Sequence, residues 1–275
     1  MSKLGRIARL VRAELLKIRS HPLFIVSILV ILIVIPLAIF FQTPDETYTY
    51  SKLNSIQLFS YGFKYGFKVA SVFILIFAAM IFSMEFDKGT IKNLLTRPVT
   101  RTEVFAAKIL ATAVTAAFLL LLTLYITLIF SLINGELGPI WDKEYYYIKM
   151  DYDALLDNLY MAVKLTLPST IAAIFFGIAI STLTESSGNA VALALSIFMV
   201  LDFVSGFSFI SSGVKFIFNY YPDYAFNTLK SFVEGYTQKK WEEDITKYYL
   251  IIPLAYSVVF AVVSYLVFKF KNIIA

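Results

Sequence analysis

The sequence predicts an all-α integral membrane protein with six transmembrane helices. Of the 275 residues, 59% are hydrophobic and only 16% are charged, and the apolar residues gather in six long blocks. A helix rises about 1.5 Å per residue, so a block of about 18 or more apolar residues can cross a hydrocarbon core about 30 Å thick. Because soluble domains are about 25% charged, this composition excludes an ordinary soluble enzyme.

The apolar blocks define a short N-terminal segment and one membrane domain. Residues 1–22 are expected to form an amphipathic helix, and residues 23–275 form the six-span domain. The third block is the longest and must tilt or protrude from the bilayer. The spans are placed at about 23–41, 67–86, 104–133, 163–183, 190–210 and 249–268.

The N-terminal segment is amphipathic at helical spacing. Its basic residues, which include Arg6, Arg9 and Lys17, lie outside one apolar stripe. Spacings of i, i+3, i+4 and i+7 put residues on one helical face. Such a basic helix lies in the membrane interface, although a fragment of a soluble core would show the same spacing. The stripe consists of Leu4, Ile7, Ala8, Val11, Leu15 and Ile18.

Lysine and arginine are distributed unevenly between the two sides of the predicted spans. They concentrate in the N-terminal segment, in the loop between the second and third spans and in the tail, whereas the loop between the third and fourth spans is acidic. Cytoplasmic loops carry the excess of these residues, so both termini are expected in the cytoplasm. The loop before the last span carries five lysines on the outside, but long loops translocate largely regardless of charge.

The loop between the second and third spans contains a connecting segment, residues 89–101. Gly89 can end the second span, Thr90 can cap a short helix, and Pro98 stops that helix. Thr100 and Glu103 match a capping box that opens the third span. We expect a short coupling helix across the cytoplasmic face, although an ordinary tight loop fits the same spacing. The candidate partner-binding residues are Gly89, Thr90, Ile91, Leu94, Leu95, Arg97, Pro98 and Arg101.

Two carboxylates in the apolar blocks are further candidates. Asp202 is the one carboxylate well inside a predicted span, and Glu85 lies at the end of the second span. Ionisable groups in lipid are costly and mark functional sites by default, so Asp202 is a candidate for a substrate or ion path. A structural hydrogen bond or a break in the fifth helix is the alternative. Gly62 and Gly66 match a helix-packing motif, but their place at the outer edge of the second span indicates a chance match.

No catalytic residue and no metal site is predicted. The one histidine, His21, precedes Pro22 at the start of a span, so a cap or a role in the membrane interface is expected rather than catalysis. A single histidine excludes a multi-histidine metal site and an H-E-x-x-H protease, and the lack of cysteine excludes a thiolate metal site. The chain also lacks a G-x-x-x-x-G-K-[ST] loop to cradle nucleotide phosphates, and nucleic acid is not an expected partner.

Several motifs resemble those of type-2 ABC transporter permeases, in order along the whole chain. The tail departs from this pattern, because many relatives carry Arg-Asp where this chain has Lys271-Asn272. The matching motifs are Glu14-Leu-Leu-Lys-Ile-Arg-Ser-His-Pro, Glu85 with Lys88-Gly89-Thr90, Leu94-Leu95-Thr96-Arg97-Pro98-Val99-Thr100-Arg101 before Lys108, Tyr221-Pro222-x-x-Ala225-Phe226, and Phe268-Lys-Phe-Lys-Asn-Ile.

This resemblance implies the roles of the segments and the partners. The first helix would be an elbow at the cytoplasmic surface, and the connecting segment would contact a separate ABC ATP-binding subunit that carries ATP and Mg. A second permease copy or a paralogue would complete the dimer in the lipid bilayer of a prokaryotic plasma membrane. The expected function is that of an exporter permease. The alternatives are an ATP-independent secondary transporter and a non-transport membrane scaffold or immunity protein.

Overall fold

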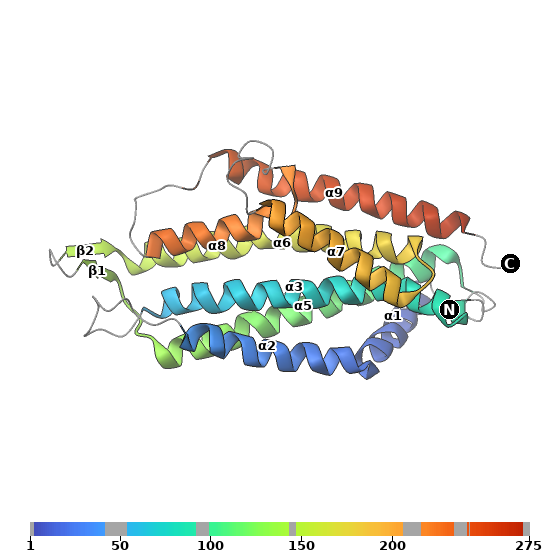
Figure 1. Ribbon diagram of the computed structural model, residues 1–275, viewed down its shortest axis with the longest axis horizontal. Helices are drawn as coiled ribbons and strands as arrows, with labels where there is room; N and C mark the ends of the chain where they lie inside the picture. The colour runs from blue at the N-terminus through green and yellow to red at the C-terminus, as the bar shows by residue number, and fades with distance from the viewer. Residues whose placement is uncertain are drawn as a thin grey trace.

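The computed structural model describes residues 3–41, 54–91, 99–142, 147–205, 216–233, 241 and 243–271. Within these ranges six helices are long and apolar enough to cross a membrane, which confirms the predicted all-α membrane class. They lie side by side along the long axis of the molecule (Figure 1). These helices are α2 (Pro22–Phe40), α3 (Ser55–Asp87), α5 (Arg101–Asn134), α6 (Tyr152–Leu183), α7 (Ser187–Ser205) and α9 (Glu243–Phe270).

A separate helix, α1 (Lys3–Ser20), precedes the first span at one end of the bundle, here called the α1 end (Figure 1). His21 breaks the chain between α1 and α2 because its backbone is extended (φ −78°, ψ 133°), which a residue before proline prefers. The Nδ1 atom of His21 accepts a hydrogen bond from the N–H of Leu23, so the expected cap is confirmed. This break lets α1 turn and pack against α5.

The opposite end carries two features that hydropathy did not indicate. Strands β1 (Ile140–Asp142) and β2 (Tyr147–Met150) form an antiparallel pair, so this is here called the hairpin end (Figure 1). Helix α8 (Tyr220–Val233) packs against α6 and α3, and its 14 residues are too few to cross a bilayer. Both features lie outside the six spans.

Helices α3 and α6 form the interior of the bundle. In their most apolar stretches 61% and 72% of residues are buried, against 22%, 17% and 22% in α2, α7 and α9. The outer three helices therefore expose most of their apolar surface, as lipid-facing helices do. Helices α3, α5 and α6 have 33, 34 and 32 residues, about 50 Å each, so they extend beyond a hydrocarbon core.

Small residues let the helices approach α3 closely. A Cβ atom added at Gly66 would lie 2.8 Å from Ile35 of α2 and 2.9 Å from Thr123 of α5, and Gly62 is similarly close to both helices. The prediction that this G-x-x-x-G pair is a chance match is therefore wrong. The prediction was wrong because it placed the start of the span at residue 67. Helix α3 begins at Ser55, so both glycines lie within the helix and face its neighbours.

Candidate functional site

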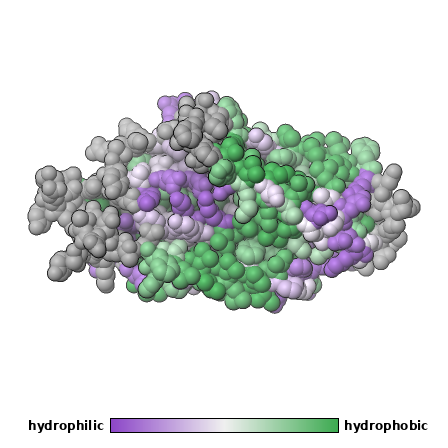
Figure 2. All heavy atoms as spheres, viewed as in Figure 1, coloured by the Kyte–Doolittle hydropathy of each residue, from purple (hydrophilic) through white to green (hydrophobic). Residues whose placement is uncertain are grey.

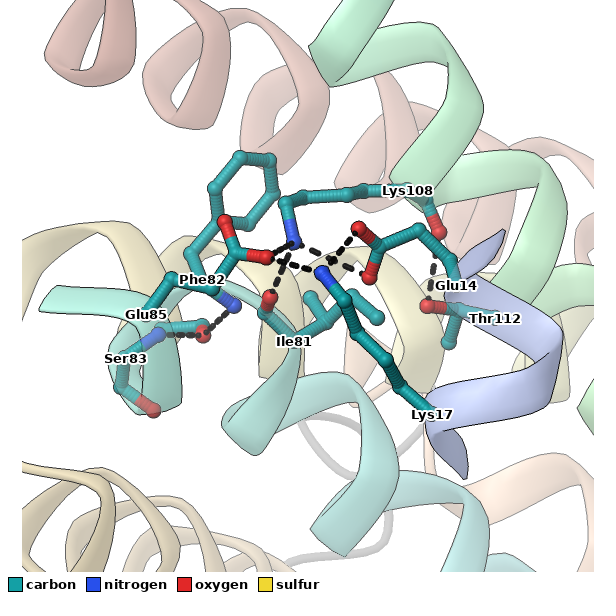
Figure 3. A network of polar contacts seen from close by, with 9 residues as sticks. Glu14, Lys17, Ile81, Phe82, Ser83, Glu85, Lys108 and Thr112 are labelled. Carbon is teal, nitrogen blue, oxygen red and sulfur yellow. Dashed lines mark hydrogen bonds and ion pairs between the residues drawn. The ribbon is translucent and has the colours of Figure 1, made fainter. Parts of the chain in front are cut away.

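Four charged side chains from three helices form a closed ring at the α1 end (Figure 3). The ammonium of Lys108 in α5 lies 3.1 Å from a carboxylate oxygen of Glu14 in α1 and 3.2 Å from one of Glu85 in α3. The ammonium of Lys17 in α1 lies 2.9 Å from Glu14 and 2.5 Å from Glu85. Positive and negative charges alternate, so this charge ring is neutral overall.

Burial makes the pairing within the charge ring obligatory. The side chains of Lys108, Glu14 and Glu85 are only 1%, 5% and 6% exposed. The Lys108 ammonium also donates to the carbonyl of Ile81 at 2.8 Å and lies 5.3 Å from the ring centroid of Phe82. Its three N–H groups thus face three oxygen acceptors. Close oxygen acceptors offset the hydration that a buried ammonium loses. Removing one partner would therefore leave a costly unpaired charge.

Helix boundaries position the four groups. Glu14 and Lys17 are three residues apart on α1, which puts them on one helical face, and the break at His21 sets the angle of that face. Glu85 lies in the last turn of α3, and Lys108 lies in the second turn of α5. The ring therefore depends on where three helices begin and end.

Lys17 is the member of the charge ring that water reaches, with a side chain 45% exposed. Burial lowers its pKa, but hydrogen bonds from Lys17 to Glu85 and Glu14 outweigh this effect, so the net pKa lies above its ordinary value of 10.5. A raised lysine pKa contributes stability that is lost only as the pH rises through the folded-state value. The charge on Lys17 is therefore retained throughout the neutral range.

The charge ring stands directly before the connecting segment. Gly89 has a left-handed backbone (φ 63°), and its N–H donates to the carbonyl of Phe86, so it ends α3 as expected. Two residues on, the side chain of Ile91 is buried at 3% exposure. The rest of the predicted coupling helix, with Leu94, Leu95, Arg97 and Pro98, lies outside the described residues.

The far end of the connecting segment is also held. Thr100 and Glu103 form the predicted capping box of α5, which is confirmed in both directions. Glu103 makes a second contact that the sequence did not indicate, because it accepts hydrogen bonds from Arg6 of α1 at 2.8 and 3.1 Å. The guanidinium of Arg101 donates to the carbonyls of Phe268, Lys269 and Lys271 at the end of α9. The start of α5 is therefore tied to both α1 and α9.

Helices α6 and α7 meet α3 at the same end. The hydroxyl of Ser181 in α6 accepts from the backbone N–H groups of Phe82 and Ser83 at 2.9 and 3.0 Å. Asp87 accepts from the hydroxyl of Ser187, the first residue of α7, at 2.7 Å. The last two turns of α3 thus contact α1, α5, α6 and α7.

Asp202 lies away from the charge ring, in the last turn of α7. Residues 206–210 of the predicted span lie outside the described residues. One carboxylate oxygen of Asp202 lies 3.5 Å from the ammonium of Lys68 in α3, and the other accepts from the side-chain amide of Asn219 at 3.1 Å. Asp202 is therefore paired and 39% exposed, not an isolated acid deep in a span. The structure does not bring it together with Glu85.

Three members of the charge ring were missed as site residues: Glu14, Lys17 and Lys108. Two signals in the sequence point to them. Lys108 is a lysine inside an apolar span, where an ionisable group needs a partner, and Glu14 is the only acidic residue in the basic N-terminal segment. These signals indicate that Lys108 needs an acidic partner, but they do not identify which acid supplies it.

Six long apolar helices in the described part of the chain define a multi-pass membrane protein. The chain belongs to the ABC-2 transporter family, because residues 10–202 match the sequence profile of the ABC-2 family transporter protein. The matched range includes the whole charge ring and the connecting segment. A comparison with curated proteins found no match. Family membership confirms the resemblance and identifies the chain as a permease component of an ABC transporter.

Replacing Lys108 with methionine should destabilise the protein strongly. The variant leaves two buried carboxylates facing Lys17 alone, and breaking a buried ion pair costs about 3–5 kcal/mol of unfolding free energy. The expected result is a clearly lower Tm of the purified protein in detergent. Adding Glu14→Gln to Lys108→Met restores a neutral ring and should recover part of the loss.

The matched control for Lys108→Met is Lys17→Met, because Lys17 pairs with the same two carboxylates but is half exposed. Its loss of Tm should be smaller, because water already screens the pairs of the half-exposed Lys17 and because the buried Lys108 still pairs with both carboxylates. Equal losses for the two lysines, with no recovery in the Lys108→Met/Glu14→Gln variant, would show that the four charges do not act as one buried ring.

Proposed function

We propose that this chain is the membrane-spanning subunit of an exporter whose ATP is hydrolysed by a separate subunit. Membership of the ABC-2 family supports a permease that works with an ABC ATP-binding subunit. The observation that carries the proposal is that both ends of the connecting segment are anchored. One end follows Glu85 of the charge ring, and the other begins with Thr100 and Arg101, which tie α5 to α1 and α9.

The anchoring suggests how nucleotide-driven motion reaches the spans. A partner ATPase that holds ATP and Mg²⁺ would bind residues 89–101 and displace this segment when it closes. The displacement would pass to α3 at Gly89 and to α5 at Thr100. Because the charge ring joins α1 to both helices, and Arg101 joins α9 to α5, we expect these four helices to move together.

The same proposal sets the orientation and the assembly. The excess of lysine and arginine at the α1 end favours its placement in the cytoplasm of a prokaryote, with the plasma membrane around the spans. Two permeases, identical or paralogous, and two ATPases would form the transporter, with the substrate path between the permeases. Family membership favours this function over an ATP-independent secondary transporter or a membrane scaffold.

The orientation has a direct test, because the native chain has no cysteine. Leu137→Cys lies at the hairpin end and Lys88→Cys lies at the α1 end, and both positions are exposed. In intact cells a membrane-impermeant maleimide should label position 137 and should reach position 88 only after permeabilisation. The reverse pattern would place the termini outside and exclude a cytoplasmic ATPase at the connecting segment.

The docking itself is tested by the double variant Leu94→Asp/Leu95→Asp. Burying two leucines in a partner groove contributes about 3–5 kcal/mol before association costs, so two aspartates there should release the ATPase. The variant should insert normally, yet a tagged copy purified from native membranes should no longer co-purify a Walker A protein. Substrate-stimulated ATP hydrolysis should be lost as well.

The matched control places the same two charges at the other end of the molecule. Leu137 and Ile148 are 60% and 44% exposed near the hairpin, so Leu137→Asp/Ile148→Asp should keep the ATPase bound. Wild-type co-purification and coupled hydrolysis by the Leu94→Asp/Leu95→Asp variant would mean that the segment is only a connector.

A further inference from the structure

The backbone of α3 makes an unusual contact with a side chain of α6. The N–H groups of Phe82 and Ser83 both donate to the hydroxyl oxygen of Ser181, at 2.9 and 3.0 Å (Figure 3). In an α-helix only the first four N–H groups lack a carbonyl partner within the helix. These two residues lie far from the start of α3, so their regular partners are the carbonyls of Ala78 and Ala79. The oxygen of Ser181 therefore competes with two backbone carbonyls for the same donors.

Side chains also contact the carbonyl groups of this turn, residues 79–83, which we call the α3 turn. The hydroxyl of Ser83 donates to the carbonyl of Ala79 at 2.7 Å, and the ammonium of Lys108 donates to the carbonyl of Ile81 at 2.8 Å. A serine that bonds four residues back along a helix often bends it. A side chain that inserts into the backbone ladder is a recognised cause of sharp kinks. The α3 turn is thus a point at which this helix can bend.

A glycine brings α6 close enough for Ser181 to reach the backbone of α3. Gly177 lies four residues before Ser181, on the same face of α6. A Cβ atom added at Gly177 would lie 2.6 Å from the Cβ atom of Ala78. Because Cβ atoms do not approach each other so closely, a side chain at this position would push the two helices apart. The contact of Ser181 with α3 therefore depends on this glycine.

The side of the α3 turn that faces α1 is less tightly filled. A cavity of about 30 Å³, enough for a water molecule, lies between α1 and α3. Figure 2 shows that the apolar surface of the bundle gives way to hydrophilic side chains toward the α1 end. Ile81 is about 6 Å along the helix from the charge ring, so the turn lies at this border, with room beside it to change shape. The lining of the cavity on α3 consists of Phe77, Met80, Ile81, Met84 and Glu85.

We propose that the α3 turn is a hinge with two arrangements of the same hydrogen-bond donors. In the arrangement of this structure, Phe82 and Ser83 donate to Ser181. In the other arrangement they donate only to the carbonyls of Ala78 and Ala79, and α3 is a regular helix. Neither arrangement leaves a buried N–H group without a partner, so the two interconvert without the cost of an unpaired donor. Ser181 is a positioning residue that favours the first arrangement.

The place of the hinge suits the proposed permease function, on which its role in transport rests. The end of α3 leads into the connecting segment at Gly89, and Glu85 ties this end to α1 and α5 through the charge ring. The longer part of α3 lies on the other side of the hinge and packs against α6. A displacement of the connecting segment would therefore bend α3 at the hinge and leave its packing within the membrane intact.

The test is hydrogen–deuterium exchange of the purified full-length chain in dodecyl maltoside, without an ATPase, read by mass spectrometry at the amides of residues 80–84. Ser181→Ala removes the competing oxygen, so Phe82 and Ser83 return to the regular ladder and their exchange should slow about tenfold. A tenfold change corresponds to about 1.4 kcal/mol, the net contribution of about one hydrogen bond. If Ser181 only stabilised the packing of α3 on α6, its loss would instead speed the exchange of these amides.

The matched control is Ser169→Ala, which removes another buried hydroxyl of α6. Ser169 is 3% exposed, and its hydroxyl has no hydrogen-bond partner in the described part of the chain. The control variant should exchange at residues 80–84 as the native chain does. Faster or unchanged exchange in Ser181→Ala would overturn the hinge, and so would equal slowing in Ser169→Ala.

The role of the hinge in transport is tested in the complex that a tagged chain co-purifies from native membranes. Adding ATP should change the exchange of residues 80–84 in the native complex but not in the Ser181→Ala complex, which already holds the regular arrangement. An equal response in both complexes, or none in the native complex, would overturn this role. Failure to co-purify an ATPase would contradict the proposed function, whereas exchange in the isolated chain decides the hinge independently.

Discussion

The α1 end of this protein is organised by the need to pair buried charges. Lys108 is 1% exposed inside a helix that crosses the membrane, so its charge requires carboxylates from other helices. Glu14 and Glu85 meet this requirement from α1 and α3. Any motion that separates one of these helices from the others would leave a buried charge without a partner. We therefore expect the ring to hold these three helices together where the connecting segment leaves the bundle.

Two charged layers bound the apolar band of the molecule. The charge ring and the capping box form one layer, and Lys68 with Asp202 and Asp223 forms the other. They differ in burial, because the ring is closed and mostly dry whereas the second layer is partly open to its surroundings. We therefore expect the closed, neutral ring to hold the helices together.

The sequence predicts those features that depend on neighbouring residues or on long averages. Hydropathy located six spans, and the local Thr100–Glu103 pattern located the start of α5. Partners distant in sequence could not be predicted, because pairing Lys108 with Glu14, or Lys68 with Asp202, requires the packing of whole helices. Helix α8 was missed because its 14 residues are amphipathic rather than uniformly apolar, so no membrane-length signal exists.

The central claim is that the charge ring makes α1, α3 and α5 move as one body, and an intramolecular distance tests it most directly. Spin labels at the exposed positions Leu16 of α1 and Leu110 of α5 report this distance by pulsed electron paramagnetic resonance. Labelled chain is diluted into unlabelled chain so that only distances within one chain are measured. The account predicts one narrow distance distribution that is the same in the nucleotide-free and ATP-bound complexes. A shift or a second distance on ATP binding would contradict it.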